Sequence, residues 1–276
     1  MKLPPSPDGA RGLPGAPALG RPPPTRRRVP VVATRRIVAT SGGFLPTDRW
    51  GVVSAGSIIR HALHLTGAER PRVCLLMTAL GDSATYLAMS YAALSTLSVD
   101  VSHVALFPQP NVDIEETLGR ADFIWVGGGS VANLLAVWEL HGVDNAMREA
   151  WDRGAVLGGV SAGSICWHVG GPTDSFGPTL EPITNGLALL PYGNGVHYDS
   201  EEQRRPLLHG LVADRVLPTS YATDDRVGIL YEGTEPVAVL SDAADRESPD
   251  GPAAYRVERT NGGSVVETRL PPGPLS

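Results

Sequence analysis

The residues with the clearest chemical meaning form the turn Gly159-Val160-Ser161-Ala162-Gly163, which matches G-x-S-x-G between an apolar run and a helix-compatible segment. A serine on a sharp strand-to-helix turn has a strained backbone, and small neighbours let the chain bend tightly. The helix that begins there directs its N–H groups at the oxyanion of an acyl transfer, so the N–H of Ala162 is the natural donor. The turn predicts Ser161 as a nucleophile, with a purely structural glycine-rich strand end as the alternative.

Two nearby side chains are weaker candidates for the nucleophile. Ser164 would lie about one helical turn beyond Ser161, where capping or packing is the simpler role. Cys166 carries a thiol, but its predicted position inside the helix is not an elbow. The sequence therefore favours Ser161.

A second glycine-rich turn, Gly127-Gly128-Gly129-Ser130, closes an apolar strand and opens another helix. Phosphate binding is one use of such a turn, but the Lys-Ser/Thr pair of a P-loop is missing and the spacing is not a dinucleotide fingerprint. A second backbone donor to the oxyanion, from Gly128 or Gly129, agrees better with the nearby elbow. The alternative is a tight turn that only lets a helix pack closely.

A catalytic serine needs a base, and that base needs an orienting acid. Among the seven histidines, His197 lies in a loop of small residues followed by charged ones, where a catalytic imidazole could be displayed. His168 lies seven residues past Ser161 on the same predicted helix, about 10 Å along it, and is poorly placed to accept the serine proton. The pattern leaves His197 as the candidate base.

The elements that must position these residues alternate, from residue 36 onward, between short apolar runs and helix-like stretches. We expect strands over residues 37–40, 73–77, 99–106, 123–126 and 155–160, and helices over residues 57–64, 83–94, 131–140 and 162–167. This order predicts an α/β fold with a mostly parallel sheet and helices on both faces. Ligands collect at the carboxyl ends of such strands, where the two glycine turns and a third, Ser41-Gly42-Gly43, are expected.

The rest of the chain is expected to contribute an edge to this domain. Runs near residues 227–231, 237–240, 254–257 and 265–270 predict antiparallel edge strands. Residues 1–33 are rich in Pro, Gly and Arg and predict a disordered leader. We therefore expect a single hydrolytic domain over residues 34–270 and a frayed tail over residues 271–276.

Composition and charge limit the kinds of binding partner and the cellular compartment that we expect for this protein. A net charge of −6 argues against nucleic acid or an anionic membrane as the main partner. Neither a membrane-length apolar run nor a secretory signal is found, so a cytoplasmic protein is expected. The two cysteines, Cys74 and Cys166, lie in apolar surroundings and are interpreted as small buried hydrophobes, because a disulfide framework or zinc site needs more.

The segments VGGGS, GGVSAGSICWHVGGPTDSFGP, GVHYDSEEQRRP and YATDDRVGIL together resemble the peptidase E and cyanophycinase family of serine peptidases, over residues 37–231. The resemblance implies a fold related to class I glutamine amidotransferases, with serine in place of their cysteine. It also implies a Ser-His-acid triad that cleaves dipeptides or isopeptide links involving aspartate. Carried onto this sequence, the nucleophile is Ser161, the base is His197, and the oxyanion donors are Gly128 or Gly129 together with Ala162. No metal or cofactor is expected.

The third member of the triad is implied only by the same resemblance. Family members typically carry a glutamate where this chain has Thr223-Asp224-Asp225-Arg226. Asp224 matches best and Asp225 follows it. Asp174 is the competing carboxylate, since it matches an acidic position between nucleophile and histidine, although it could also be a simple turn residue.

Substrate preference is where the chain departs from the family. Members that cleave aspartyl dipeptides place an arginine shortly after the histidine, where it pairs with the substrate carboxylate. The corresponding position here is Glu201 or a neighbour, while Arg204 and Arg205 follow and could replace that arginine. Without such a replacement, an acidic pocket would repel an aspartyl side chain and favour a basic or neutral one.

The resulting hypothesis is a serine-type, peptidase E-like dipeptidase that acts on a small peptide substrate. One rival is a different enzyme on the same scaffold, either a cyanophycinase-like isopeptidase or an amidase for a small amide. The other rival is a catalytically silent binding module with the amidotransferase-like fold. The sequence leaves the oligomeric state open, a homodimer included.

Overall fold

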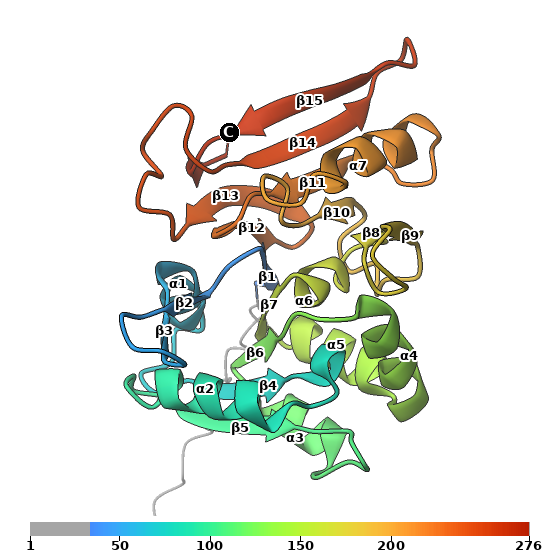
Figure 1. The fold of residues 1–276 in the computed structure, drawn as a ribbon. Coiled ribbons are helices and arrows are strands. Elements are labelled where there is room, and N and C mark those ends of the chain that lie inside the picture. The colour runs from blue at the N-terminus through green and yellow to red at the C-terminus, as the bar shows by residue number, and fades with distance from the viewer. Residues whose placement is uncertain (1–33, 276) are drawn as a thin grey trace, which may run out of the picture. The chain divides into compact units, whose positions relative to one another are not determined.

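The apolar runs form an eight-stranded sheet at the centre of the computed structural model, which describes residues 34–275 (Figure 1). Its strand order is β16-β13-β12-β1-β7-β6-β4-β5. Neighbours from β1 to β5 pair in parallel, whereas β12, β13 and β16 extend the β1 edge antiparallel. The bounds are β1 Arg36–Thr40, β4 Arg72–Leu76, β5 Asp100–Val104, β6 Phe123–Val126, β7 Val156–Val160, β12 Val227–Glu232, β13 Glu235–Ser241 and β16 Gly273–Pro274. The predicted mostly parallel sheet is confirmed.

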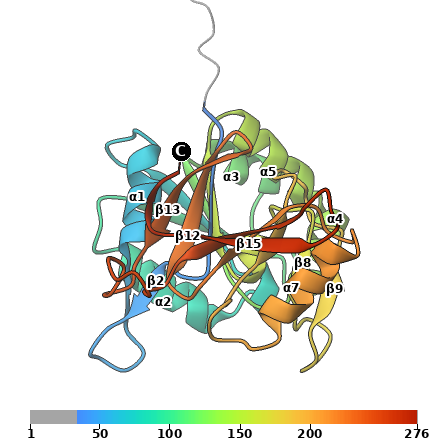
Figure 2. The ribbon, with the colours of Figure 1, turned by 90° about the horizontal axis from the view of Figure 1, so that it is seen from above.

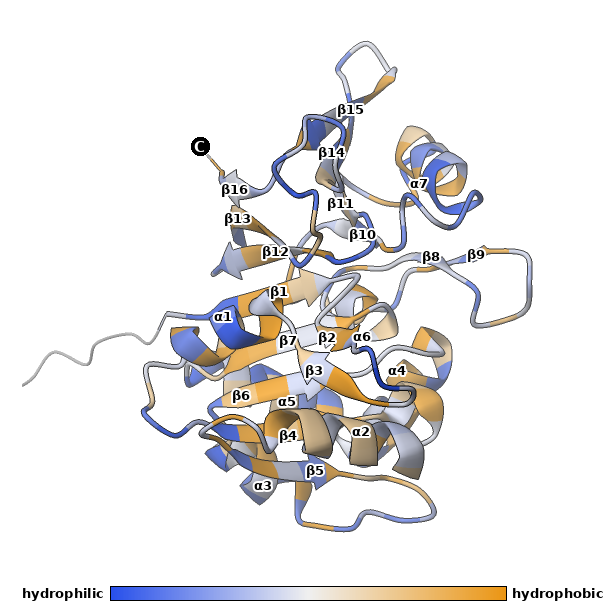
Figure 3. Ribbon diagram, turned by 60° about the vertical axis from the view of Figure 1, so that its left-hand side comes forward, coloured by the Kyte–Doolittle hydropathy of each residue, from blue (hydrophilic) through white to orange (hydrophobic). Residues whose placement is uncertain are grey.

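Helices cover both faces of this sheet because its strands are apolar on both sides. Along β1, Val38 packs on one face with α1, while Ile37 and Ala39 pack on the other face with α4, α5 and α6. Helix α2 joins the α1 face and α3 joins the opposite one. The bounds are α1 Ser57–Leu65, α2 Ala84–Leu94, α3 Ile114–Arg120, α4 Val131–His141, α5 Val143–Asp152 and α6 Ala162–Ile165, with a 3₁₀ turn η1 over Thr78–Leu80. Figure 3 shows the apolar character of the inner strands β6 and β7 and the polar outer side of α1.

A second sheet lies beside the antiparallel edge and packs against helix α7 Arg204–Ala213. Its order is β10-β11-β14-β15, with bounds β10 Gly193–Gly195, β11 Ser220–Thr223, β14 Ala254–Arg259 and β15 Val265–Leu270. Leu208, Leu211 and Val212 of α7 join Val257 of β14 in a separate small core. The late strands, expected as one antiparallel edge, therefore divide between two sheets. Strands β14 and β15 lie at the top in Figure 1, and β15 crosses the front of the view from above in Figure 2.

Two short hairpins complete the rim of the main sheet. Strands β2 Phe44–Pro46 and β3 Val53–Ala55 form the first, and β8 Gly171–Thr173 and β9 Glu181–Ile183 form the second. The first follows β1 directly, at the carboxyl edge of the parallel strands, and the second follows α6.

The C-terminal tail differs from the expectation that it is frayed. The tail expected to be frayed instead forms β16, which pairs with β13, and the N–H of Leu275 donates to the carbonyl of Val237 at 2.8 Å. Leu275 packs against the main core, and this apolar contact is the physical reason that the tail is ordered. The predicted leader, residues 1–33, lies outside the described residues. Between residues 34 and 275, no helix is both long and apolar enough to span a bilayer.

Candidate active site

Ser161 occupies a strained turn between β7 and α6, as the G-x-S-x-G pattern predicts. Its φ of 56° and ψ of −113° lie far from helical or extended backbone. The Ser161 N–H donates to the Thr40 carbonyl of β1 at 3.0 Å, and the Ser161 carbonyl accepts from the N–H groups of Ser164 and Ile165. These bonds hold the serine at the carboxyl end of the central strands.

The two glycines of the pattern are required by close backbone contact. A Cβ on Gly159 would collide with the Gly163 carbonyl, and a Cβ on Gly163 would collide with the Val126 carbonyl of β6. A side chain at either position would push the elbow away from the sheet. The small residues therefore let α6 begin directly above β6 and β7.

The loop Gly127-Gly128-Gly129 runs directly alongside the serine. A Cβ built on Gly128 would lie 3.2 Å from Ser161 Cβ and 3.8 Å from Ser161 Oγ. Gly129 has a φ of 123°, which only glycine adopts without strain. Across residues 34–275, the N–H groups of Gly128, Gly129 and Ala162 have no hydrogen-bond acceptor. Unpaired N–H groups beside the Ser161 hydroxyl are what an oxyanion hole needs.

His197 is held at the same edge by its backbone. It follows β10 with a φ of 51°, and its N–H donates to Ser41 Oγ at 3.1 Å. Ser41 comes directly after Thr40, whose carbonyl binds Ser161, so the end of β1 joins the two candidate catalytic residues. In the part of the chain that the structure describes, no hydrogen bond joins the Ser161 hydroxyl to His197, a contact that often tightens only with substrate bound.

The carboxylate beside the imidazole is Asp225. His197 Nδ1 lies 2.6 Å from Asp225 Oδ1, and donation from Nδ1–H leaves Nε2 as the proton acceptor. The N–H of Asp225 in turn donates to Asp199 Oδ1 at 2.8 Å. The pair is partly solvated, since the Asp225 side chain is 44% exposed. The structure therefore brings an imidazole and a carboxylate together as a hydrogen-bonded pair.

Asp224, the residue that matches the family's acid best, forms no hydrogen bond or ion pair with His197 among residues 34–275. It is buried, and its Oδ2 accepts from the Ala253 N–H at 2.9 Å and from the Tyr255 hydroxyl at 3.1 Å. Burial raises the pKa of this carboxyl, and the Ala253 N–H partly offsets that. Asp224 thus anchors the start of β14 through these two bonds.

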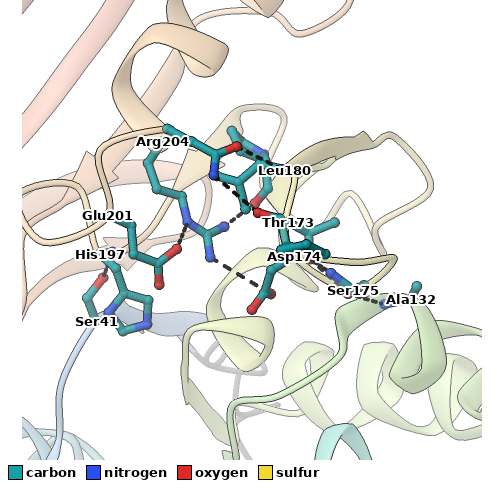
Figure 4. Close-up of polar contacts among 12 residues, drawn as sticks. Ser41, Ala132, Thr173, Asp174, Ser175, Leu180, His197, Glu201 and Arg204 are labelled. Carbon is teal, nitrogen blue, oxygen red and sulfur yellow. Dashed lines mark hydrogen bonds and ion pairs between the residues drawn. The ribbon is translucent and has the colours of Figure 1, made fainter.

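Asp174, the other proposed acid, lies in the β8–β9 hairpin. Its carboxylate is 62% exposed and 4.0 Å from the Arg204 guanidinium. Figure 4 shows Asp174 and Glu201 on either side of Arg204, with His197 on the Glu201 side. In the described chain Asp174 makes no hydrogen bond or ion pair with His197.

Neither arginine expected to bind substrate is presented to the serine. Arg204 is buried, with its Nε 2.7 Å from Glu201 Oε2 and its Nη1 2.6 Å from the Pro172 carbonyl. Arg205 lies over the Tyr198 and Tyr255 rings and pairs with Glu267. Of the three residues proposed to bind substrate, Glu201 is the one bonded to the histidine loop, because its N–H donates to the His197 carbonyl at 3.0 Å. Both guanidinium groups therefore hold the histidine loop and α7 in place.

The remaining candidates near the elbow are structural. Ser164 is fully buried and donates to Asn194 Oδ1 at 2.9 Å, and burial raises the pKa of the Cys166 thiol well above its usual value. Burial lowers the pKa of His168 to about 4, so its imidazole is neutral and bonds the Ser164 carbonyl through Nδ1–H.

The residue that sequence reasoning missed is Ser41. Its glycine-rich turn at a strand end was a signal, but nothing in the sequence linked it to His197.

Comparison with known proteins gives a consistent result. The profile of Peptidase family S51 matches residues 50–238. The uncharacterized peptidase YgaJ of Bacillus subtilis (strain 168) is 36% identical over 223 residues, which are 81% of this chain and 92% of that protein. Peptidase E of Shewanella denitrificans is 31% identical over 142 residues, 48% of this chain and 59% of that protein. The crystal structure of a peptidase from an acI-B1 Actinobacterium has the same fold, with a TM-score of 0.65 and 14% identity over 89% of this chain and 98% of that one.

Proposed function

Because the chain belongs to peptidase family S51 and is a serine peptidase, we propose that it hydrolyses short peptides with Ser161, His197 and Asp225 as its triad. The observation that carries this assignment is the strained Ser161 elbow beside unpaired backbone N–H groups. The His197–Asp225 bond, held against the end of β1 through Ser41, supports it. Asp225 replaces Asp224 as the proposed acid, since of these two carboxylates Asp225 is the one that bonds the imidazole.

In the acylation step, Nε2 of His197 takes the Ser161 hydroxyl proton as Oγ attacks the scissile carbonyl carbon. The carbonyl oxygen becomes an oxyanion and accepts hydrogen bonds from the N–H of Ala162 and from that of Gly128 or Gly129. The imidazolium, stabilised by Asp225, then protonates the leaving amine as the C–N bond breaks. An acyl ester on Ser161 and a free amine result.

Deacylation repeats these steps with water as the nucleophile. His197 removes a proton from the water as its oxygen attacks the ester carbonyl, and the same donors hold the second oxyanion. The imidazolium returns its proton to Ser161 Oγ as the ester bond breaks. The products are a carboxylic acid and the free serine, so the cycle closes without a net change in the protein.

The direct test is steady-state hydrolysis of a dipeptide panel by the wild-type chain and by matched variants. Ser161→Ala and His197→Ala should each lower kcat by about four to six powers of ten. His64→Ala, a substitution on the exposed side of α1, is the control for His197→Ala and should leave kcat unchanged. Near-wild-type turnover by Ser161→Ala, purified free of host peptidases, would exclude this mechanism.

A further inference from the structure

A cavity of about 420 Å³ lies against the proposed oxyanion loop. Its walls come from the β2–β3 hairpin, from α2 and from the ends of β4 and β6. The side chains that give it its character are apolar or aromatic: Phe44, Met77, Leu80, Tyr86, Met89 and Trp125. Within the described residues, its lining holds no carboxylate, ammonium, guanidinium or imidazole. Such a cavity suits an uncharged side chain.

The cavity is continuous with the reacting groups. Gly128 lines it and also packs against Ser161, where an added Cβ would lie 3.2 Å from Ser161 Cβ. Ser41 lines it and also accepts the His197 N–H at 3.1 Å. A peptide whose carbonyl is attacked by Ser161 therefore has one of its flanking side chains within reach of this cavity.

A second cavity, near Glu201 of the His197 loop, has acidic walls. Glu201, which bonds the His197 carbonyl, lines this cavity together with Asp174 and Glu202. The Arg204 guanidinium between Asp174 and Glu201 is buried and bonded to Glu201 and Pro172 (Figure 4). A carboxylate side chain placed there would face like charges.

Arg226 is a third cation near the site, since its N–H donates to the Ser41 carbonyl at 3.0 Å. Its backbone lies against Gly42, where an added Cβ would be 2.7 Å from Arg226 Cα. The Arg226 side chain is exposed and lines neither of the two cavities. An aspartyl carboxylate inside the apolar cavity would thus lose its hydration without gaining a cationic partner from the lining.

We propose that the apolar cavity is the specificity pocket of this peptidase. It receives an uncharged apolar side chain, of the size of leucine, methionine or phenylalanine, from a residue that flanks the scissile bond. The substrates are then short peptides with such a residue, and aspartyl peptides are poor substrates. This inference rests on the proposed function, because it assigns the pocket to the peptide that Ser161 attacks.

The test is a panel of dipeptides with leucine at one position and Leu, Met, Phe, Asp or Lys at the other, in both orders, and with β-linked aspartyl peptides included. The best apolar residue should exceed aspartate in kcat/KM by about tenfold or more at one of the two positions. Met89→Arg introduces a cation into the pocket wall and should lower kcat/KM for the apolar peptide while raising it for the aspartyl one. Ala88→Arg adds the same charge on the exposed side of α2 and should leave the ratio unchanged.

Binding to the Ser161→Ala protein, measured by calorimetry, separates this inference from the proposed function. Tighter binding of Leu-Leu than of Asp-Leu and Leu-Asp, reversed by Met89→Arg but not by Ala88→Arg, supports the pocket even if turnover fails. Turnover that favours aspartate at both positions and is insensitive to Met89→Arg would overturn the pocket while leaving the peptidase intact. Loss of an aspartate preference in Arg226→Ala would overturn it too, because the carboxylate would then be read outside the cavity.

Discussion

Replacing Asp225 by asparagine should impair catalysis far more than the same change at Asp224, although the two carboxylates are adjacent in sequence. Asp225 Oδ1 lies 2.6 Å from His197 Nδ1 and stabilises the imidazolium that forms when Ser161 is deprotonated. Asparagine keeps the shape but removes the charge. Asp224 instead binds the Ala253 N–H and the Tyr255 hydroxyl, so its substitution does not touch the imidazole.

The size of the effect follows from the exposure of the ion pair. Unit charges about 4 Å apart attract by roughly 4 kcal/mol at an effective dielectric constant of 20 and by roughly 1 kcal/mol in water. The Asp225 side chain is 44% exposed, which places the pair between these limits. Since about 1.4 kcal/mol corresponds to a tenfold change in rate, kcat of Asp225→Asn should fall by about 5- to 1,000-fold.

Asp224→Asn is the matched control. Its amide oxygen can still accept from Ala253 and Tyr255, and its amide nitrogen replaces Oδ1, a buried atom that lacks a partner among the described residues. The change also removes a buried charge, so the fold should be retained and kcat should change by less than about fivefold, the lower limit of the charge effect at Asp225.

The assay is kcat for the best dipeptide, with thermal unfolding of each variant to exclude a folding defect. A larger loss of activity in Asp224→Asn than in Asp225→Asn, with both variants folded, would show that Asp225 is not the acid. Full activity of Asp225→Asn together with impaired Asp174→Asn would place the acid in the β8–β9 hairpin.

Three further outcomes are expected. Ser41→Ala removes the acceptor of the His197 N–H, and should lower the free energy of unfolding by about 1–3 kcal/mol in urea titrations and lower kcat as well. Gly128→Ala sets a methyl 3.2 Å from Ser161 Cβ, and should lower kcat by about tenfold or more with little change in the melting temperature. His168, buried with a pKa of about 4, stays neutral in the folded state while the unfolded histidine gains a proton below its usual pKa of 6.5. Its contribution is therefore complete above pH 6.5 and is lost as the pH falls toward 4, so unfolding at pH 4.5 should be easier than at pH 7 by about 2–3 kcal/mol from this residue.

Each outcome has a result that contradicts it. An unchanged free energy of unfolding for Ser41→Ala would mean that the histidine loop does not depend on that bond. Wild-type kcat for Gly128→Ala would place the oxyanion donor elsewhere. If His168→Phe keeps the full loss of stability between pH 7 and pH 4.5, another group titrates.

The parts of the site that sequence could predict are those specified by local chain geometry. The elbow at Ser161 is such a part, because the glycines at 159 and 163 are demanded by contacts to neighbouring backbone. The central strands are another, because apolar residues on both faces mark a buried parallel sheet. These features depend on spacing of a few residues and on composition, which the sequence displays directly.

The acid could not be chosen from sequence for a geometric reason. Asp224 and Asp225 follow the end of β11, where neighbouring side chains point to opposite sides of the chain. A shift of one residue in the alignment to the family therefore decides which carboxylate is matched to the one that reaches His197. The resemblance does not fix the alignment to a single residue.

The arginines failed as substrate-binding candidates because a sequence does not show burial of charge. Charged residues are normally exposed, yet Arg204 is 2% exposed and is bonded to Glu201 and the Pro172 carbonyl.

Helix α5 was not predicted, although the sequence carries a signal for it. Val143, Met147 and Trp151 are buried with the spacing of one helix face.

The most direct test of the central claim is labelling of the intact protein with a fluorophosphonate probe, followed by peptide mapping of the adduct. We expect one adduct on Ser161, strongly reduced in His197→Ala and reduced less in Asp225→Asn. Labelling of Ser41 in place of Ser161, or labelling of Ser161 at the wild-type rate in His197→Ala, would contradict the claim that His197 activates Ser161.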